Sequence, residues 1–197
     1  MTKAKSEPKV ETSGLLEQAQ RAAKKGPPPV HLWNPDYCGE MDMRIARDGT
    51  WFHEGTPIGR APLVKLFASI LKLEEGRYYL VTPVEKLGIV VEDAPFIAVD
   101  FTREGAGEAQ RLTFTTNVGD EVTAGPEHPI RVERHGPEGE PAPYVMVRRG
   151  LEARIDRKSF YRLVEIGVTR PHEGADWFGL MSDGAFFPVI PAAELGS

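Results

Sequence analysis

The residues best suited to bind a ligand in this sequence are arginines, and they are concentrated in one stretch. Residues 131–162 hold eight basic and five acidic side chains, a local net charge of +3 in a chain whose net charge is −5. A guanidinium group binds phosphate or carboxylate through two parallel hydrogen bonds and stacks on flat rings. Three of these arginines are expected to bind the anion of a ligand: Arg148, Arg154 and Arg157. The alternative is that the arginines of this stretch are solvated or pair with Glu152 and Asp156.

Other polar and aromatic side chains are expected to complete such a site. Arg157 falls in the first turn of a predicted helix, where free backbone N–H groups favour anions. Tyr144 or Tyr79 offers a ring for stacking on a base, and a residue before proline, such as His128, is held extended and can face a cleft. Hydroxyl, amide and carboxylate groups would orient the ligand: Thr116, Asn117 and Glu85. The alternative is that these are ordinary strand and turn residues.

An enzyme is the rival interpretation. Glu92, Asp93 and His128 can serve as acid, base or cation ligands of a small hydrolase if they converge in one cleft. The sequence has no P-loop and no G-x-S-x-G motif, and Gly105-Ala-Gly107 lacks the third glycine of a dinucleotide fingerprint. Cys38, the single cysteine, excludes an internal disulfide, and its acidic neighbours favour a buried, inert thiol, although a redox role stays open.

The composition is that of a globular protein, with 41% hydrophobic and 27% charged residues. The 17 prolines and 20 glycines exclude a simple helical bundle, since both residues interrupt helices. The acidic net charge argues against a nucleic-acid partner. No apolar stretch approaches the roughly 18–20 residues needed to span a bilayer, and the N-terminus lacks a signal-peptide core, so we expect no membrane association and a cytoplasmic location.

Hydrophobic periodicity predicts three helices among antiparallel strand pairs. The first helix begins near Ser13 and ends before the proline run at 27–29. The second begins near Pro62 and ends at Gly76, and the third lies between Asp156 and Gly167. Strand-like segments share β-branched or aromatic residues and turn glycines: 43–47, 50–52, 77–82, 88–93, 96–103, 110–116, 130–135, 144–149, 151–155, 176–181 and 185–190.

The sequence contains an internal repeat at an offset of 97 residues. The pattern of 58–67, Ile-x-Arg-x-x-Leu-x-x-Leu-Phe, matches 155–164, Ile-x-Arg-x-x-Phe-x-x-Leu-Val. A duplicated β-β-α-β-β unit predicts an α+β fold of two lobes, each with a mostly antiparallel sheet covered by one helix. We expect an N-terminal tail and helix at 1–30, a first lobe at 31–95 and a second, larger lobe at 96–197. A third functional alternative is a protein-interaction module that docks a partner through residues 1–30.

The sequence also resembles a bacterial family of domains of unknown function, the one numbered 1285. Its motifs are specific in combination and cover most of residues 33–165: Cys38-Gly39, Asp42-Met-Arg-Ile45, Asp48-Gly49-x-Trp51, Pro57-Ile58-x-Arg60, Tyr78-Tyr-Leu-Val-Thr-Pro-Val-Glu-Lys86, Val91-Glu-Asp-Ala-Pro-Phe96, Phe114-x-Thr116-Asn117, His128-Pro129 and Pro143-Tyr-Val-x-Val-Arg148. The resemblance implies two related lobes, the second loosely similar to a pleckstrin-homology fold. It also implies a pocket between the lobes suited to a nucleotide-like ligand, and a role in signal transduction linked to oxidative stress. It supplies no catalytic residues.

These observations favour a non-catalytic protein that binds a small phosphate-bearing or nucleotide-like ligand between its lobes. No metal ion and no cofactor are identified from the sequence, and a protein partner stays open. The nine residues given above for the ligand are inferred from residue type and spacing.

Overall fold

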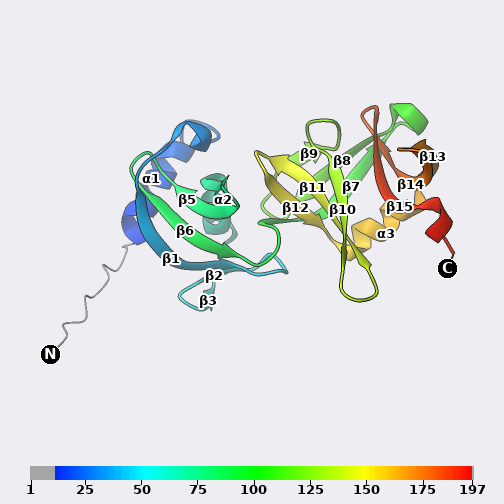
Figure 1. Cartoon of the computed structure of the whole chain (residues 1–197). Helices are drawn as coiled ribbons and strands as arrows, with labels where there is room; N and C mark the ends of the chain where they lie inside the picture. Colours follow the sequence, from blue (N-terminus) through cyan, green and yellow to red (C-terminus); the bar gives the residue numbers. More distant parts are fainter. Residues whose placement is uncertain (1–11, 197) are drawn as a thin grey trace. The chain divides into compact units, whose positions relative to one another are not determined.

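The computed structural model describes residues 12–196, so the N-terminal tail of the expected 1–30 segment lies largely outside the described residues. The chain divides into two compact units (Figure 1). The first comprises the residues through Arg44 together with Trp51–Val90. The second comprises Ile45–Thr50 and Val91–Ser197, so the tip of one hairpin belongs to the second unit.

The first unit is a six-stranded sheet with two α-helices, in the strand order β3-β2-β1-β6-β5-β4. Its strands are β1 (Tyr37–Ile45), β2 (Trp51–His53), β3 (Thr56–Pro57), β4 (Leu71–Glu74), β5 (Arg77–Val81) and β6 (Lys86–Val91). Its helices are α1 (Thr12–Ala23), the 3-10 turn η1 (Val30–Leu32) and α2 (Ala61–Ser69). Helix α1 buries Leu15 and Ala19 and contacts α2. Trp51 stacks on Phe67 of α2, with the ring centroids 6.4 Å apart.

The expected second helix is too long at its C-terminal end. Helix α2 ends at Ser69, and Gly76 instead lies with Glu75 in the turn between β4 and β5. Leu63, Leu66, Phe67, Ile70 and Leu71 follow helical spacing, and Ile70 and Leu71 are indeed buried, but Leu71 already pairs with Leu80 in the sheet. Periodicity alone does not separate the end of a helix from a short buried strand.

The second unit combines a six-stranded sheet with a three-stranded sheet and one α-helix. The strand orders are β10-β11-β12-β7-β8-β9 and β13-β14-β15, and every neighbouring pair in this unit is antiparallel except β12 with β7. The elements are β7 (Phe96–Glu104), η2 (Gly107–Ala109), β8 (Arg111–Thr116), β9 (Glu121–Thr123), β10 (Ile130–His135), β11 (Glu140–Arg148), β12 (Leu151–Ile155), α3 (Arg157–Glu165), β13 (Val168–His172), β14 (Ala175–Ser182), β15 (Ala185–Pro191) and η3 (Ala192–Glu194).

Buried hydrogen bonds join the two sheets of the second unit. The Ser182 hydroxyl on β14 accepts from the backbone N–H of Leu112 at 2.9 Å and donates to the carbonyl of Ala124 at 2.7 Å. Helix α3 begins as predicted, because the Asp156 carboxylate accepts a hydrogen bond from the backbone N–H of Ser159 at 2.8 Å. Helix α3 contacts β7 and β14, and its Leu163 is fully buried.

The predicted α+β class is confirmed: both units are rich in antiparallel strands and each contains one copy of the repeated helix. Each copy is followed by three strands rather than the expected two, β4–β6 after α2 and β13–β15 after α3. Strand β13 is not predicted from the sequence, because its five residues include a proline and show no clear alternation. Within residues 12–196 there is no helix with the length and apolarity to cross a membrane.

Candidate functional site

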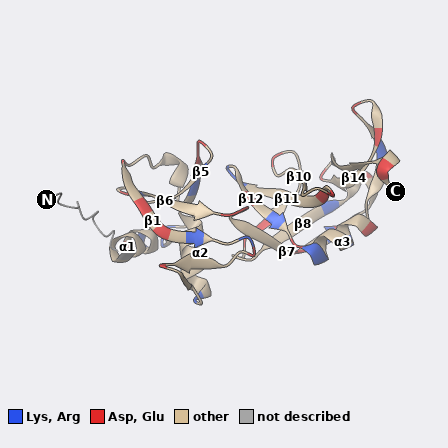
Figure 2. Cartoon of the chain, turned by 60° about the horizontal axis from the view of Figure 1, so that its bottom comes forward, with Lys and Arg blue, Asp and Glu red and all other residues tan. Residues whose placement is uncertain are grey.

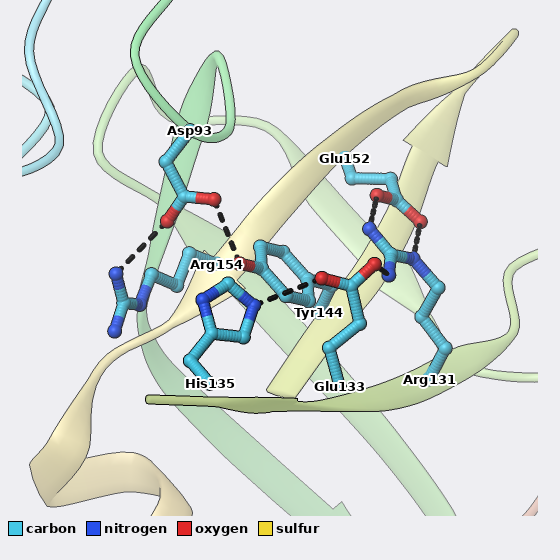
Figure 3. Close-up of polar contacts among 7 residues, drawn as sticks. All are labelled: Asp93, Arg131, Glu133, His135, Tyr144, Glu152 and Arg154. Atoms are coloured by element: carbon cyan, nitrogen blue, oxygen red, sulfur yellow. Dashed lines mark hydrogen bonds and ion pairs between the residues drawn. The ribbon is translucent and has the colours of Figure 1, made fainter. Parts of the chain in front are cut away.

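One face of the large sheet in the second unit carries a row of charged and aromatic side chains. Arg131 on β10 is in register with Tyr144 on β11, and Tyr144 is in register with Arg154 on β12. Residues directly opposite one another on neighbouring strands point to the same face of a sheet. The sheet therefore places two guanidinium groups on the two sides of one phenol ring (Figure 3).

The Arg131 guanidinium is matched by two carboxylates. Its Nε and Nη2 donate to the two carboxylate oxygens of Glu152 at 2.7 and 2.6 Å, and Nη1 pairs with Glu133. The same group lies over the Tyr144 ring, 4.4 Å from its centroid. The hydrogen bond to Glu152 is the main cause that raises the pKa of Arg131. The pairing with Glu152 is the alternative left open in the sequence analysis.

Asp93 completes the row from the segment that precedes β7. Its carboxylate accepts from the Tyr144 hydroxyl at 2.7 Å and from Nη1 of Arg154 at 2.9 Å (Figure 3). Tyr144 packs with Ala94 and Ala142 in a buried cluster. Burial, and then the hydrogen bond to Asp93, raise the pKa of Tyr144 to about 12. These contacts hold the 93–94 segment on the sheet.

His135 extends this face along β10. Its Nε2 lies 2.9 Å from Oε2 of Glu133, and this hydrogen bond, followed by the one from Arg131, lowers the pKa of Glu133. We call the face formed by Asp93, Arg131, Glu133, His135, Tyr144, Glu152 and Arg154 the paired face. Its three carboxylates outnumber its two guanidinium groups. The paired face therefore disfavours binding of a phosphate.

The tyrosine rings expected to stack on a base have little free surface. Tyr144 is 2% exposed and lies under Arg131. Tyr79 lies in the first unit and is 9% exposed, with the Lys86 ammonium 5.2 Å from its ring centroid. Glu85 also lies in the first unit, and its Oε2 is buried with no hydrogen-bond partner among the described residues.

Three further expected site residues lie near the turn between β8 and β9. The hydroxyl of Thr116 accepts from the backbone N–H of Asp120 at 3.0 Å, and Nη1 of Arg148 donates to the Asp120 carboxylate at 2.5 Å. The Asn117 side-chain oxygen accepts from the backbone N–H of Ile97 at 3.0 Å. Thr116 and Asn117 thus bind backbone N–H groups, and Arg148 binds the Asp120 carboxylate.

The tip of the Asp48-Gly49 hairpin packs against the same region. A Cβ atom at Gly49, where φ is +87°, would lie 2.8 Å from Cγ1 of Ile97 and 2.9 Å from Nδ2 of Asn117. Glycine therefore satisfies both the turn and the close approach.

His128 and Arg157 make their contacts outside these clusters. Nδ1 of His128 lies 3.1 Å from the carbonyl oxygen of Met146. Arg157 is exposed, with its guanidinium 5.9 Å from the Tyr161 ring centroid. The N-terminus of α3 already holds the Asp156 carboxylate, which disfavours a second anion there.

The acid and base groups of the rival hydrolase each bind something else. Glu92 accepts from the backbone N–H of Arg47 at 3.0 Å, Asp93 serves Tyr144 and Arg154, and His128 faces a backbone carbonyl. Across residues 12–196 no three histidine, cysteine or acidic side chains are grouped so that they could hold a metal ion.

The expectation of a buried Cys38 is wrong. Its side chain is exposed, and Sγ lies 3.2 Å from the backbone oxygen of Asp36. Cys38 stands at the second position of β1, before the part of that strand where burial begins at Met41. The acidic residues near Cys38 in the sequence therefore do not shield its thiol from solvent.

A cavity of about 270 Å³ lies in the second unit, and the sequence analysis missed it. Its lining includes two arginines, Arg103 at the end of β7 and Arg170 on β13, together with Glu108 of η2. We call it the arginine cavity. Arg103 makes no ion pair or side-chain hydrogen bond within residues 12–196. Arg170 donates to Oε1 of Glu108 at 3.2 Å, and the Glu108 side chain is 82% exposed.

Comparison with known proteins places these two units in one family. The model described as "Domain of unknown function (DUF1285), N-terminal domain" matches residues 28–94, and that described as "Protein of unknown function (DUF1285), C-terminal domain" matches residues 95–189. No curated protein matches the chain.

Two solved structures are similar to the chain. A DUF1285 family protein from Silicibacter pomeroyi DSS-3 is 60% identical, with a TM-score of 0.84 over 93% of this chain and 98% of that one. A DUF1285 family protein from Shewanella baltica OS155 is 31% identical, with a TM-score of 0.50 over 64% of this chain and 91% of that one.

Proposed function

Since the chain belongs to the DUF1285 family, a family of unknown function, we propose from the geometry of its second unit that it is a non-catalytic binding protein for a small anionic ligand. The observation that carries this proposal is the unbalanced charge of the arginine cavity. Two guanidinium groups line it, and the single carboxylate of the lining, that of Glu108, is strongly exposed and pairs with Arg170. An anion entering the cavity would gain charge-assisted hydrogen bonds without first displacing a buried partner.

The paired face supports this choice by contrast. Each of its guanidinium groups already binds a carboxylate, and Asp93 and Glu152 are only 11% and 18% exposed. A ligand phosphate there would meet a face whose carboxylates outnumber its guanidinium groups, and like charges repel strongly where solvent is excluded. The arginines of the 131–162 stretch that form this face are therefore assigned to holding the fold.

The size of the cavity limits the ligand. A cavity of about 270 Å³ has room for several water molecules. The expected nucleotide-like ligand between the lobes stays a prediction. Phosphate and small carboxylates fit.

A binder of this kind can take part in signal transduction or a stress response without doing chemistry. A ligand that prefers one conformation of the protein shifts the population toward it. The sequence resemblance suggested such a role, and the proposal keeps it as the consequence of ligand binding.

Isothermal titration calorimetry of the full chain tests the proposal. The panel contains inorganic phosphate, nucleoside monophosphates and small carboxylates, each titrated to millimolar concentration at low salt. We expect saturable binding of at least one small anion, weakened by Arg103→Gln. The matched control is Arg111→Gln, because Arg111 is on β8, pairs with Asp183 at 3.4 Å and is absent from the cavity lining. No binding by any member of the panel overturns the proposal.

A further inference from the structure

We infer, resting on the proposed function, that the arginine cavity binds a monocarboxylate with a compact apolar body, and that Arg103 binds its carboxylate. The proposed function requires only a small anion. The inference names its chemical class from the walls of the cavity, and it also names the residue that recognises the charged end.

The charge of the lining favours a single negative charge. Arg103 and Arg170 supply two positive charges and Glu108 supplies one negative charge, which leaves one positive charge to be balanced. Arg170 is oriented by two contacts, from Nη2 to Glu108 and from Nη1 to Sδ of Met181, both at 3.2 Å. Arg103 has no such contact with the described residues, so its planar fork of donors is available for a carboxylate.

Three apolar side chains form part of the wall. Ile166 follows α3, Val168 begins β13 and Met181 lies on β14 with only 6% of its surface exposed. A phosphate ion has no surface that would benefit from these groups. A carboxylate that carries a ring or a branched chain would bury that body against them, and burial of apolar surface is favourable in water.

The floor of the cavity is held in place before any ligand enters. Gln110 is 3% exposed, and its Nε2 donates to the carbonyl oxygen of Met181 at 2.7 Å. The backbone carbonyl of Gln110 in turn accepts from the N–H of Asp183 at 2.9 Å. A wall that is already ordered loses little conformational entropy when a ligand binds.

Benzoate is a suitable probe, because it joins one carboxylate to a compact apolar ring and is small enough for a cavity of about 270 Å³. Benzamide is the matched neutral probe, since it has the same ring and nearly the same shape without the charge. Inorganic phosphate is the matched anion without an apolar body. The three probes separate the charge from the apolar contact.

The experiment is calorimetric titration of the full chain with these three probes, repeated on variants. We expect benzoate to bind at least about tenfold more tightly than benzamide or phosphate, since one charge-assisted pair or one buried ring is worth about this factor. Arg103→Gln is expected to weaken benzoate binding about tenfold or more, and Arg111→Gln to leave it unchanged. Val168→Glu, at a position 40% exposed and therefore tolerant, is expected to weaken it as well, by adding a negative charge to the wall.

The possible outcomes separate the inference from the proposed function. If phosphate binds and benzoate does not, the carboxylate inference is wrong and the anion-binding function stands. If neither binds, the inference is wrong, and the proposed function is wrong as well if no other anion of the earlier panel binds. Benzoate binding that Arg103→Gln leaves unaltered also rejects the inference, because the carboxylate then lies elsewhere. Circular dichroism of each variant establishes that it is folded.

Discussion

The paired face and the arginine cavity of the second unit use the same side chains for opposite purposes. On the paired face, Arg131 and Arg154 meet three carboxylates, of which Asp93 and Glu152 are largely buried. In the arginine cavity, one guanidinium group, that of Arg170, pairs with a carboxylate that is mostly in solvent, and that of Arg103 pairs with none of the described residues. The difference teaches that a guanidinium group marks a binding site only where no carboxylate of the protein already satisfies it.

Charge is distributed over the whole chain, and Figure 2 shows acidic and basic segments interspersed along the elements of each unit. No single element therefore identifies the site by its charge. The pairing of each group decides which of them is available to a ligand.

The largest effect is expected from removing a carboxylate of the paired face. Asp93→Ala leaves the buried Tyr144 hydroxyl and the Arg154 guanidinium without their shared acceptor, at a cost of about 2–4 kcal/mol in the free energy of unfolding. The matched variant Glu108→Ala, in the arginine cavity, removes an exposed carboxylate and should leave stability unchanged. Urea denaturation followed by circular dichroism measures both. Equal losses in the free energy of unfolding for the two variants would contradict the distinction between the paired face and the arginine cavity.

A smaller effect is expected from Tyr144→Phe, which removes one hydroxyl and keeps the ring. The lost hydrogen bond to Asp93 should lower the free energy of unfolding by about 1–2 kcal/mol. Tyr161→Phe is the control, since Tyr161 is 59% exposed and does not belong to the paired face. The same denaturation experiment compares the two, and a loss in the control as large as that in Tyr144→Phe would contradict the assignment.

The paired face also predicts how stability depends on alkaline pH. The pKa of Tyr144 is raised from 10.0 to about 12, so the native state favours its protonated form. The stabilisation that Tyr144 adds to the free energy of unfolding is therefore complete below pH 10 and is lost progressively as the pH rises to about 12. Chemical denaturation at several alkaline pH values should show this loss in the parent protein and a weaker dependence in Tyr144→Phe. Identical pH profiles would show that Tyr144 titrates normally.

The smallest effect concerns the arginine cavity itself. Glu108→Gln removes the carboxylate that competes for Arg170, and benzoate affinity should rise by about twofold to fourfold, the size expected of an exposed charge pair. Calorimetric titration of the variant and of Glu104→Gln, an exposed glutamate outside the cavity lining, measures the change. A decrease in affinity would mean that Glu108 helps to hold the ligand.

Local features of this fold were predictable from the sequence because they depend on neighbouring residues. The Asp48-Gly49 turn and the Asp156 cap of α3 are set by short-range hydrogen bonds, from the Thr50 N–H to Asp48 at 2.9 Å and from the Ser159 N–H to Asp156. The end of α2 was not predictable, because Leu71 satisfies a helical stripe and a buried strand equally well.

The candidate site could not be predicted for a different reason. Arg154 was singled out by its charge, but its partner Asp93 lies in the segment between β6 and β7, far from Arg154 in the sequence, and the contact becomes visible only in the structure. Arg103 and Arg170 stand apart from the arginine-rich stretch, so no local pattern joined them. A ligand cavity is formed by tertiary packing, whereas composition reports only the total number of charges.

A crystal structure of the full chain grown with benzoate compares the two regions most directly. The account predicts density for the ligand in the arginine cavity, with its carboxylate on the guanidinium of Arg103 and its ring against Ile166, Val168 and Met181. Benzoate bound to Arg131 or Arg154 on the paired face, with only solvent beside Arg103, would contradict it.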